Sequence, residues 1–218
     1  MNLKEYLIAP ELDGFYKFDP KLNIAVLASG KGSNFQNLLK LSKKEELDIN
    51  IVKLITNNKD ADCIDKAIKG GISYEVISDK DYENKIDFEN ELINVIKKQN
   101  VEIIVLAGWM KILSAKFVNT FKNKIINIHP SLLPSFKGNK AIEKAYSENV
   151  LITGCSVHFV VTAVDSGKLI IQGALPIIKG ETIKELELRI HELEHIILPL
   201  GVSEAGRILR NGLMDKSF

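Results

Sequence analysis

This chain has little cysteine, no long apolar run and almost no excess of one charge. Its 218 residues include two cysteines, Cys63 and Cys155, which lie far apart and outside any Cys-x-x-Cys or Cys/His spacing. Neither a disulfide framework nor a zinc site is therefore indicated. No segment approaches the roughly 20 apolar residues of a membrane span, and the first residues lack the pattern of a signal peptide. We expect a cytoplasmic protein with no metal and no membrane partner.

Basic and acidic side chains are nearly balanced. The chain has 29 Lys and Arg against 28 Asp and Glu, for a formal net charge of +1. No basic surplus is available for nucleic acid, so an anionic ligand must be held by a local site. The hydrophobic content of 45% is ordinary for a globular protein, and the length suffices for one domain with a full core.

Alternating apolar segments predict the fold. Short apolar runs, typical of strands buried on both faces, alternate with segments that have apolar residues at helical spacing. This alternation predicts a parallel sheet with right-handed crossovers. The expected strands are residues 23–28, 49–55, 73–77, 101–107 and 125–129, and the expected helices are residues 35–41, 60–69, 82–99 and 114–121.

The two ends of the chain depart from this alternation of strands and helices. Strands at 154–161 and 169–178 are joined by a connection too short for a helical crossover, so they should pair antiparallel. A long amphipathic helix is expected from residue 183 to about 210. Residues 1–22 are interpreted as an N-terminal arm, and residues 23–218 as a single domain. The predicted fold class is α/β: a Rossmann-like, doubly wound, mostly parallel sheet with antiparallel strands in its C-terminal part.

Two polar side chains share one face of the strand that ends at Pro130. Side chains alternate along a strand, so Asn127 and His129 point the same way while Ile126 and Ile128 point the other way. Pro130 cannot donate to a sheet ladder, which leaves the polar pair at the carboxyl end of the strand. Open parallel sheets bind their ligands at that edge. Taken alone, a buried histidine and a turn-forming asparagine would explain the same residues.

A glycine turn follows the first predicted strand of the domain. It does not fit a dinucleotide fingerprint, because Phe35 stands where a third small residue is needed and the second strand ends without an acid. Gly32, Ser33 and Asn34 nevertheless combine a close backbone approach with N–H groups at a helix N-terminus, which suits a phosphate. A tight turn with a serine cap is the alternative.

Asp165 and the histidines allow more than one interpretation. Asp165 precedes Ser166 and Gly167 and is by itself more typical of a turn cap than of a catalytic group. His158 alternates with apolar residues in a predicted strand and is interpreted as structural. His191 and His195 have the i, i+4 spacing of a metal pair, and residues 191–195 match the His-Glu-x-x-His pattern, but we expect no metal there.

Four motifs together resemble the folate-dependent phosphoribosylglycinamide formyltransferases, the glycinamide ribonucleotide transformylases of purine synthesis. They are Ser29-Gly30-Lys31-Gly32-Ser33-Asn34, Leu106-Ala107-Gly108-Trp109-Met110-Lys111-Ile112-Leu113-Ser114, Asn127-Ile128-His129-Pro130-Ser131-Leu132-Leu133-Pro134, and Gly154-Cys155-Ser156-Val157-His158-Phe159-Val160 ahead of Asp165. The likeness runs in order from about residue 23 to about residue 210 and is highly specific. It implies transfer of a formyl group from 10-formyltetrahydrofolate to glycinamide ribonucleotide.

The resemblance also implies roles for particular residues. Catalysis would rest on Asn127, His129 and Asp165. The substrate phosphate would be held by Gly32, Ser33 and Asn34, and the rest of the ribonucleotide by Glu194. The folate pocket would be lined by Lys85, Met110, Ile112, Leu113, Val118, Val161 and Val164. The sequence departs from the family where many members have His-x-His after the loop glycine, because Lys140 and Ile142 stand there.

Other activities are compatible with parts of the pattern. Formyltetrahydrofolate hydrolases use the same Asn, His and Asp residue types, with water as the formyl acceptor. They carry an additional N-terminal domain that the arm is too short to contain. Methionyl-tRNA formyltransferase would need an added C-terminal domain and a basic surface. A non-catalytic nucleotide-binding module gives no reason for the three catalytic residue types to occur together. A monomer and a homodimer are equally compatible with the sequence.

Overall fold

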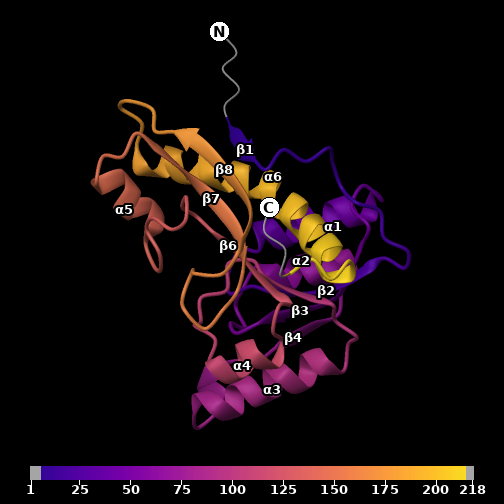
Figure 1. Ribbon diagram of the computed structural model, residues 1–218. Helices are drawn as coiled ribbons and strands as arrows, with labels where there is room; N and C mark the ends of the chain where they lie inside the picture. The colour runs from indigo at the N-terminus through magenta and orange to yellow at the C-terminus, as the bar shows by residue number, and fades with distance from the viewer. Residues whose placement is uncertain (1–5, 215–218) are drawn as a thin grey trace.

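An eight-stranded sheet with helices on both faces forms the body of the protein (Figure 1). The computed structural model describes residues 6–214. The strands are β1 (Leu7–Ala9), β2 (Leu22–Leu27), β3 (Ile49–Thr56), β4 (Tyr74–Val76), β5 (Ile103–Leu106), β6 (Ile125–His129), β7 (Ile152–Phe159) and β8 (Leu169–Pro176). The helices are α1 (Ser33–Lys43), α2 (Cys63–Gly70), α3 (Lys85–Lys97), α4 (Ala115–Thr120), α5 (Ala141–Ser147) and α6 (Ile183–Arg210), with a 3₁₀ turn η1 (Asp79–Asp81).

The strand order is β1-β8-β7-β6-β5-β2-β3-β4. Strands β2 to β6 pair in parallel, whereas β7 is antiparallel to β6, and β8 is antiparallel to both β7 and β1. The predicted α/β class, with antiparallel strands toward the C-terminus, is therefore confirmed. The order changes direction between β2 and β5, so the crevice beyond their carboxyl ends is the switch point at which such sheets bind ligands.

Alternating side chains divide the apolar core between the two faces of the sheet. Val26 and Val105 pack with α1, α2 and α6, whereas Leu27 and Leu106 pack with α3 and α4. Figure 1 shows α3 and α4 together on one side of the sheet, away from α1, α2 and α6. Burial on both faces explains why these strands are almost wholly apolar.

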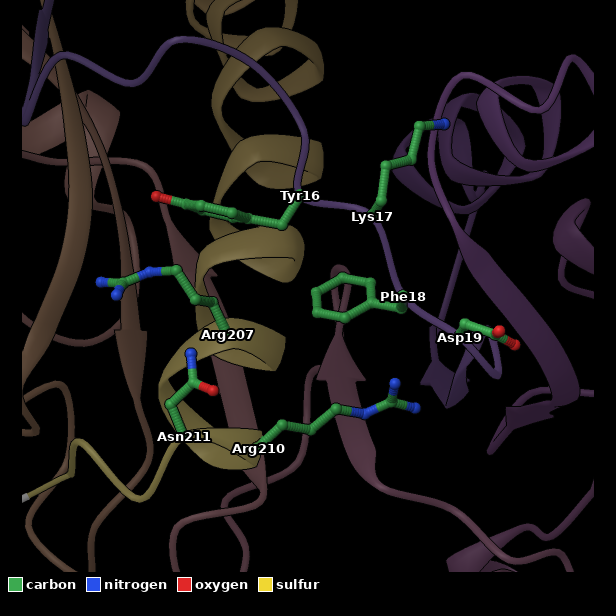
Figure 2. A pocket seen from close by; sticks show the side chains of 7 residues that line it. All are labelled: Tyr16, Lys17, Phe18, Asp19, Arg207, Arg210 and Asn211. Atoms are coloured by element: carbon green, nitrogen blue, oxygen red, sulfur yellow. The ribbon is translucent and has the colours of Figure 1, made fainter.

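The arm contributes a strand to the sheet. β1 pairs with β8 through Ile8 opposite Gly173, which covers the edge that β8 would otherwise present. Further along, Arg207 and Arg210 of α6 each lie with the guanidinium carbon 5.2 Å from a ring centroid, of Tyr16 and Phe18 respectively. Figure 2 shows both rings projecting from the arm toward these arginines. The arm is thus joined to the sheet and to the last helix.

A hollow of about 430 Å³ lies at this junction and is lined by Tyr16, Lys17, Phe18, Asp19, Arg207, Arg210 and Asn211 (Figure 2). None of the residues with a predicted functional role is among them. Its two arginines are already engaged, because Arg207 pairs with Glu204 and Arg210 with Glu102. Within the described chain, no helix is long and apolar enough to cross a bilayer.

Candidate active site

β6 presents its two polar side chains at the carboxyl edge of the sheet. Ile126 and Ile128 belong to the core beneath α1 and α6, whereas Ile125 belongs to the core beneath α3 and α4. By alternation, Asn127 and His129 point to the same side as Ile125, as the sequence predicts. His129 is buried, with 6% of its surface exposed.

Both ring nitrogens of His129 face oxygen acceptors. Its Nδ1 lies 3.4 Å from Oδ2 of Asp165, and its Nε2 lies 2.9 Å from the carbonyl oxygen of Phe136. A carbonyl oxygen only accepts, so Nε2 is the donor in that contact. Protonation of both nitrogens satisfies both contacts, and the site is therefore arranged for an imidazolium.

Asp165 is surrounded by donors that favour its charged form. Its Oδ2 accepts a 2.8 Å hydrogen bond from the backbone N–H of Gly138, and its Oδ1 lies 3.5 Å from Nε2 of His158. Burial raises the pKa of this carboxyl, but the hydrogen bond from His158, the Gly138 N–H and the charge of His129 together lower it to about 2. The carboxylate therefore reaches beyond its own turn, unlike that of a simple turn cap.

His158 is a member of this cluster that the sequence interpretation had assigned to structure. It lies opposite Asn127 in the β6–β7 register, and its Nε2 is 3.3 Å from the Asn127 amide nitrogen. Its Nδ1 lies 2.9 Å from the carbonyl oxygen of Phe159 and must donate. Nε2 therefore lies within reach of both the Asn127 amide and Oδ1 of Asp165, so His158 links the two side chains. Only the antiparallel pairing of β6 and β7 reveals this role.

The glycine turn and α6 meet through a buried contact. Gly32 is the N-cap of α1 with φ +65°, and no side chain caps the helix, so the serine cap of the alternative interpretation is absent. Ser33 and Asn34 open α1, and the Asn34 amide donates a 2.9 Å hydrogen bond to Oε2 of Glu194. Burial raises the pKa of Glu194 to about 7, although the Asn34 hydrogen bond lowers it. Oδ1 of Asn34 is buried without a partner, so an acceptor is available to a ligand here.

Gly32 meets a packing requirement besides the close backbone approach expected for a phosphate. A Cβ at this position would meet Cβ of Cys63 at 2.5 Å and Cα of Cys63 at 3.1 Å. The glycine therefore permits α2 to pack against the turn, in addition to supplying the left-handed backbone.

The residues expected to line a folate are divided between surface and core. Met110, Ile112, Val161 and Val164 are exposed, whereas Leu113 and Val118 are buried in the α3–α4 core. Exposed apolar side chains suit a flat apolar ligand. Lys85 is exposed at the start of α3 and lies 3.8 Å from Glu89, which also accepts from the backbone N–H of Ser114.

Ser29 connects the glycine turn to the segment that follows β5. Its N–H donates to the carbonyl oxygen of Gly108 at 3.1 Å, and its hydroxyl accepts from the N–H of Met110 at 2.9 Å. The two loops that flank the switch point are therefore held as one unit. Ser29 belongs to one of the motifs, but its role could not be inferred from the sequence, because its two partners lie about eighty residues further along the chain.

These features define an α/β protein with a cluster of histidine, asparagine and aspartate side chains near the topological switch point of its sheet. Residues 22–202 match the formyl transferase family, and the chain belongs to this family.

Named relatives agree with the family assignment. The chain is 41% identical over 192 residues to the human trifunctional purine biosynthetic protein adenosine-3, with 88% of the chain aligned. It spans only 19% of the length of that protein. A crystal structure of glycinamide ribonucleotide transformylase 1 from Symbiobacterium toebii superimposes with a TM-score of 0.84 at 32% identity, covering 89% of this chain and 93% of the other. Phosphoribosylglycinamide formyltransferase from Campylobacter jejuni is 41% identical, with a TM-score of 0.78, covering 83% of this chain and 95% of the other.

Proposed function

We propose that the protein transfers the formyl group of 10-formyltetrahydrofolate to the amine of glycinamide ribonucleotide, giving formylglycinamide ribonucleotide and tetrahydrofolate in de novo purine biosynthesis. The observation that carries this proposal is the convergence of Asn127, His129 and Asp165 at the carboxyl edge of the sheet. Family membership and the activities for which the relatives are named support the same reaction.

Asn127 and His129 are proposed to stabilise the transition state. Attack of an amine on a formyl carbon forms a tetrahedral oxyanion, which needs donors where the charge develops. In this proposal the formyl oxygen takes the place of the Phe136 carbonyl and accepts from Nε2 of His129, and an N–H of the Asn127 amide supplies a second donor. Both donors are held in advance, His129 by Asp165 and Asn127 by His158.

Asp165 is proposed to control the protonation of His129 and of the attacking nitrogen. Its carboxylate favours the cationic form of His129, and the attacking nitrogen can lose a proton to it through water. A carboxyl with a pKa of about 2 remains ionised at neutral pH and is a weak base by itself. We therefore assign its main contribution to keeping His129 charged.

Substrate binding is proposed to occupy both sides of the switch point. Gly32, Ser33 and Asn34 would hold the phosphate at the start of α1, and Glu194 would contact the remainder of the ribonucleotide. The folate would lie on the exposed apolar side chains Met110, Ile112, Val161 and Val164, above Leu113 and Val118, with Lys85 near its acidic tail. Positioning two substrates in this way can replace about 7–11 kcal/mol of barrier.

Incubation with 10-formyltetrahydrofolate, with and without glycinamide ribonucleotide, tests this function. We expect folate consumption only when the ribonucleotide is present, with formylglycinamide ribonucleotide as the product. Consumption at the same rate without the ribonucleotide would identify a hydrolase instead. A His129→Ala variant is the control: loss of an oxyanion donor should lower turnover by about 10²–10³-fold while both substrates still bind in calorimetry.

A further inference from the structure

Residues in and just before α2 hold three consecutive carbonyl groups of the glycine turn. The Asn58 amide lies 3.5 Å from the carbonyl oxygen of Ser29, and the N–H of Cys63 donates to Gly30 at 3.2 Å. The ammonium of Lys66 donates to the carbonyl oxygen of Lys31 at 2.6 Å. All three carbonyls are therefore directed toward the same neighbouring segment.

This arrangement fixes the direction of the amide groups in the turn. In a planar trans peptide the N–H points opposite to the carbonyl with which it shares the unit. The N–H groups of Gly30, Lys31 and Gly32 therefore point away from α2. Within residues 6–214, none of these three, nor the N–H of Ser33 or Asn34, has a hydrogen-bond acceptor. Successive free N–H groups of this kind form a concavity that binds anions.

Lys66 differs from the other two anchors because it is charged. Its hydrogen bond polarises the peptide unit that joins Lys31 and Gly32, which makes the Gly32 N–H a stronger donor. No carboxylate of the described chain forms an ion pair with Lys66, so its charge is not neutralised locally.

The charge of Lys66 also reaches α6. It contributes to the lowered pKa of His195, after burial and the charge of His191. Asn37 of α1 donates to the carbonyl oxygen of His195 at 2.7 Å, and the adjacent Glu194 contacts Asn34. Lys66 thus lies where α2, the turn and α6 come together, on the proposed ribonucleotide side of the site.

We propose that Lys66 is a positioning residue for the substrate phosphate. It orients and polarises the Lys31–Gly32 peptide, so that the turn offers a preformed set of N–H donors to a phosphate monoester. This inference rests on the proposed function, and it identifies a residue of that site that the motifs do not include.

Lys66→Met tests the proposal because it preserves the length of the side chain and removes the charged donor. We expect the KM for glycinamide ribonucleotide to rise about tenfold, as for a lost charge-assisted hydrogen bond, with kcat and the KM for the folate changed less than twofold. Lys66→Arg should restore most of the affinity. Lys69→Met, on the same helix and exposed, removes the same charge and should leave all three constants unchanged.

A second readout separates this proposal from the assignment of the reaction. Ribose 5-phosphate is titrated into ¹⁵N-labelled protein, and the amide signals of residues 30–34 are followed. They should shift in the wild type and in Lys69→Met, and require about tenfold more ligand in Lys66→Met. Equal titration curves for Lys66→Met and the wild type would overturn the proposal, even if formyl transfer is confirmed. If Lys66→Met does not fold, Lys66→Gln serves the same comparison.

Discussion

Asp165 combines an uncommon backbone conformation with several polar contacts. It adopts φ +46°, which aspartate tolerates better than most residues, and its carboxylate contacts two histidines and a backbone N–H. A turn residue would need only the local backbone conformation. The contacts with His129 and His158 depend on the negative charge.

Asp165→Asn separates these two roles. Asparagine tolerates the same backbone conformation and can accept from Gly138, so we expect a folded protein whose melting temperature falls by only a few degrees. Turnover should fall at least about a hundredfold, because the charge that favours the imidazolium is lost. Steady-state kinetics and a thermal melt measure both effects. A destabilised variant with normal turnover would return Asp165 to a structural role.

The low pKa of Asp165 determines the pH at which its charge is lost. The pKa falls from 3.8 to about 2 on folding, so its stabilising effect is complete above pH 3.8 and disappears as the pH falls toward 2. A loss of activity between pH 5 and 7 therefore has to come from another group.

Glu194 has the opposite dependence on pH. Its pKa is raised from 4.5 to about 7, so the folded protein retains a proton that the unfolded chain releases. Stability should decline as the pH rises from 4.5 to 7 and level off above, with a total effect on the order of 3 kcal/mol. Glu194→Gln should remove this decline and raise the melting temperature at pH 8. Melts of Glu187→Gln, which should follow the wild type, provide the control.

At the scale of elements, the contact between α2 and the glycine turn is the most constrained. The turn needs a left-handed residue at position 32, and Cys63 occupies the space next to it. The local φ requirement can be inferred from the glycine, but the presence of Cys63 depends on where α2 packs.

Gly32→Ala should therefore lower the stability of the folded protein even when no ligand is bound. Backbone strain and the contact with Cys63 should cost about 1–3 kcal/mol, which lowers the melting temperature by about 2–4 °C for each kcal/mol in a chain of this size. Combining it with Cys63→Gly, which removes the opposing Cβ, should relieve part of the strain. If the double variant is no better than the sum of the single changes, Cys63 is not the source of the strain.

At the scale of the whole molecule, the N-terminal arm contacts both the sheet and the last helix. β1 completes the sheet edge, and Tyr16 and Phe18 contact α6. The family match nevertheless begins only at residue 22.

A chain that begins at Leu22 tests the division between arm and domain. We expect it to fold and to transfer formyl groups, but to melt at a lower temperature. Loss of each cation–π contact should remove about 0.5–1 kcal/mol of stability, and the edge of β8 becomes exposed. Circular dichroism, a thermal melt and size-exclusion chromatography measure these properties. Failure to fold would show that the arm is an integral part of the domain.

Local periodicity in the sequence was sufficient for the class of fold and for the direction of key side chains. Apolar runs of strand length, separated by helical patterns, predicted the parallel sheet, and period-two alternation placed Asn127 and His129 on one face. These properties depend on residues a few positions apart, which is why they can be recognised in the chain alone. The motif resemblance then indicated the family.

Only the tertiary structure decided which distant groups meet. The pairing of β6 with β7 puts His158 opposite Asn127, and the loop after β6 brings the Phe136 carbonyl to His129. Asn34 reaches Glu194 across 160 residues, and Lys66 reaches the turn from a separate helix. Strand order, loop closure and helix packing fix these contacts together. No local pattern encodes them, because each one depends on the folding of the whole sheet.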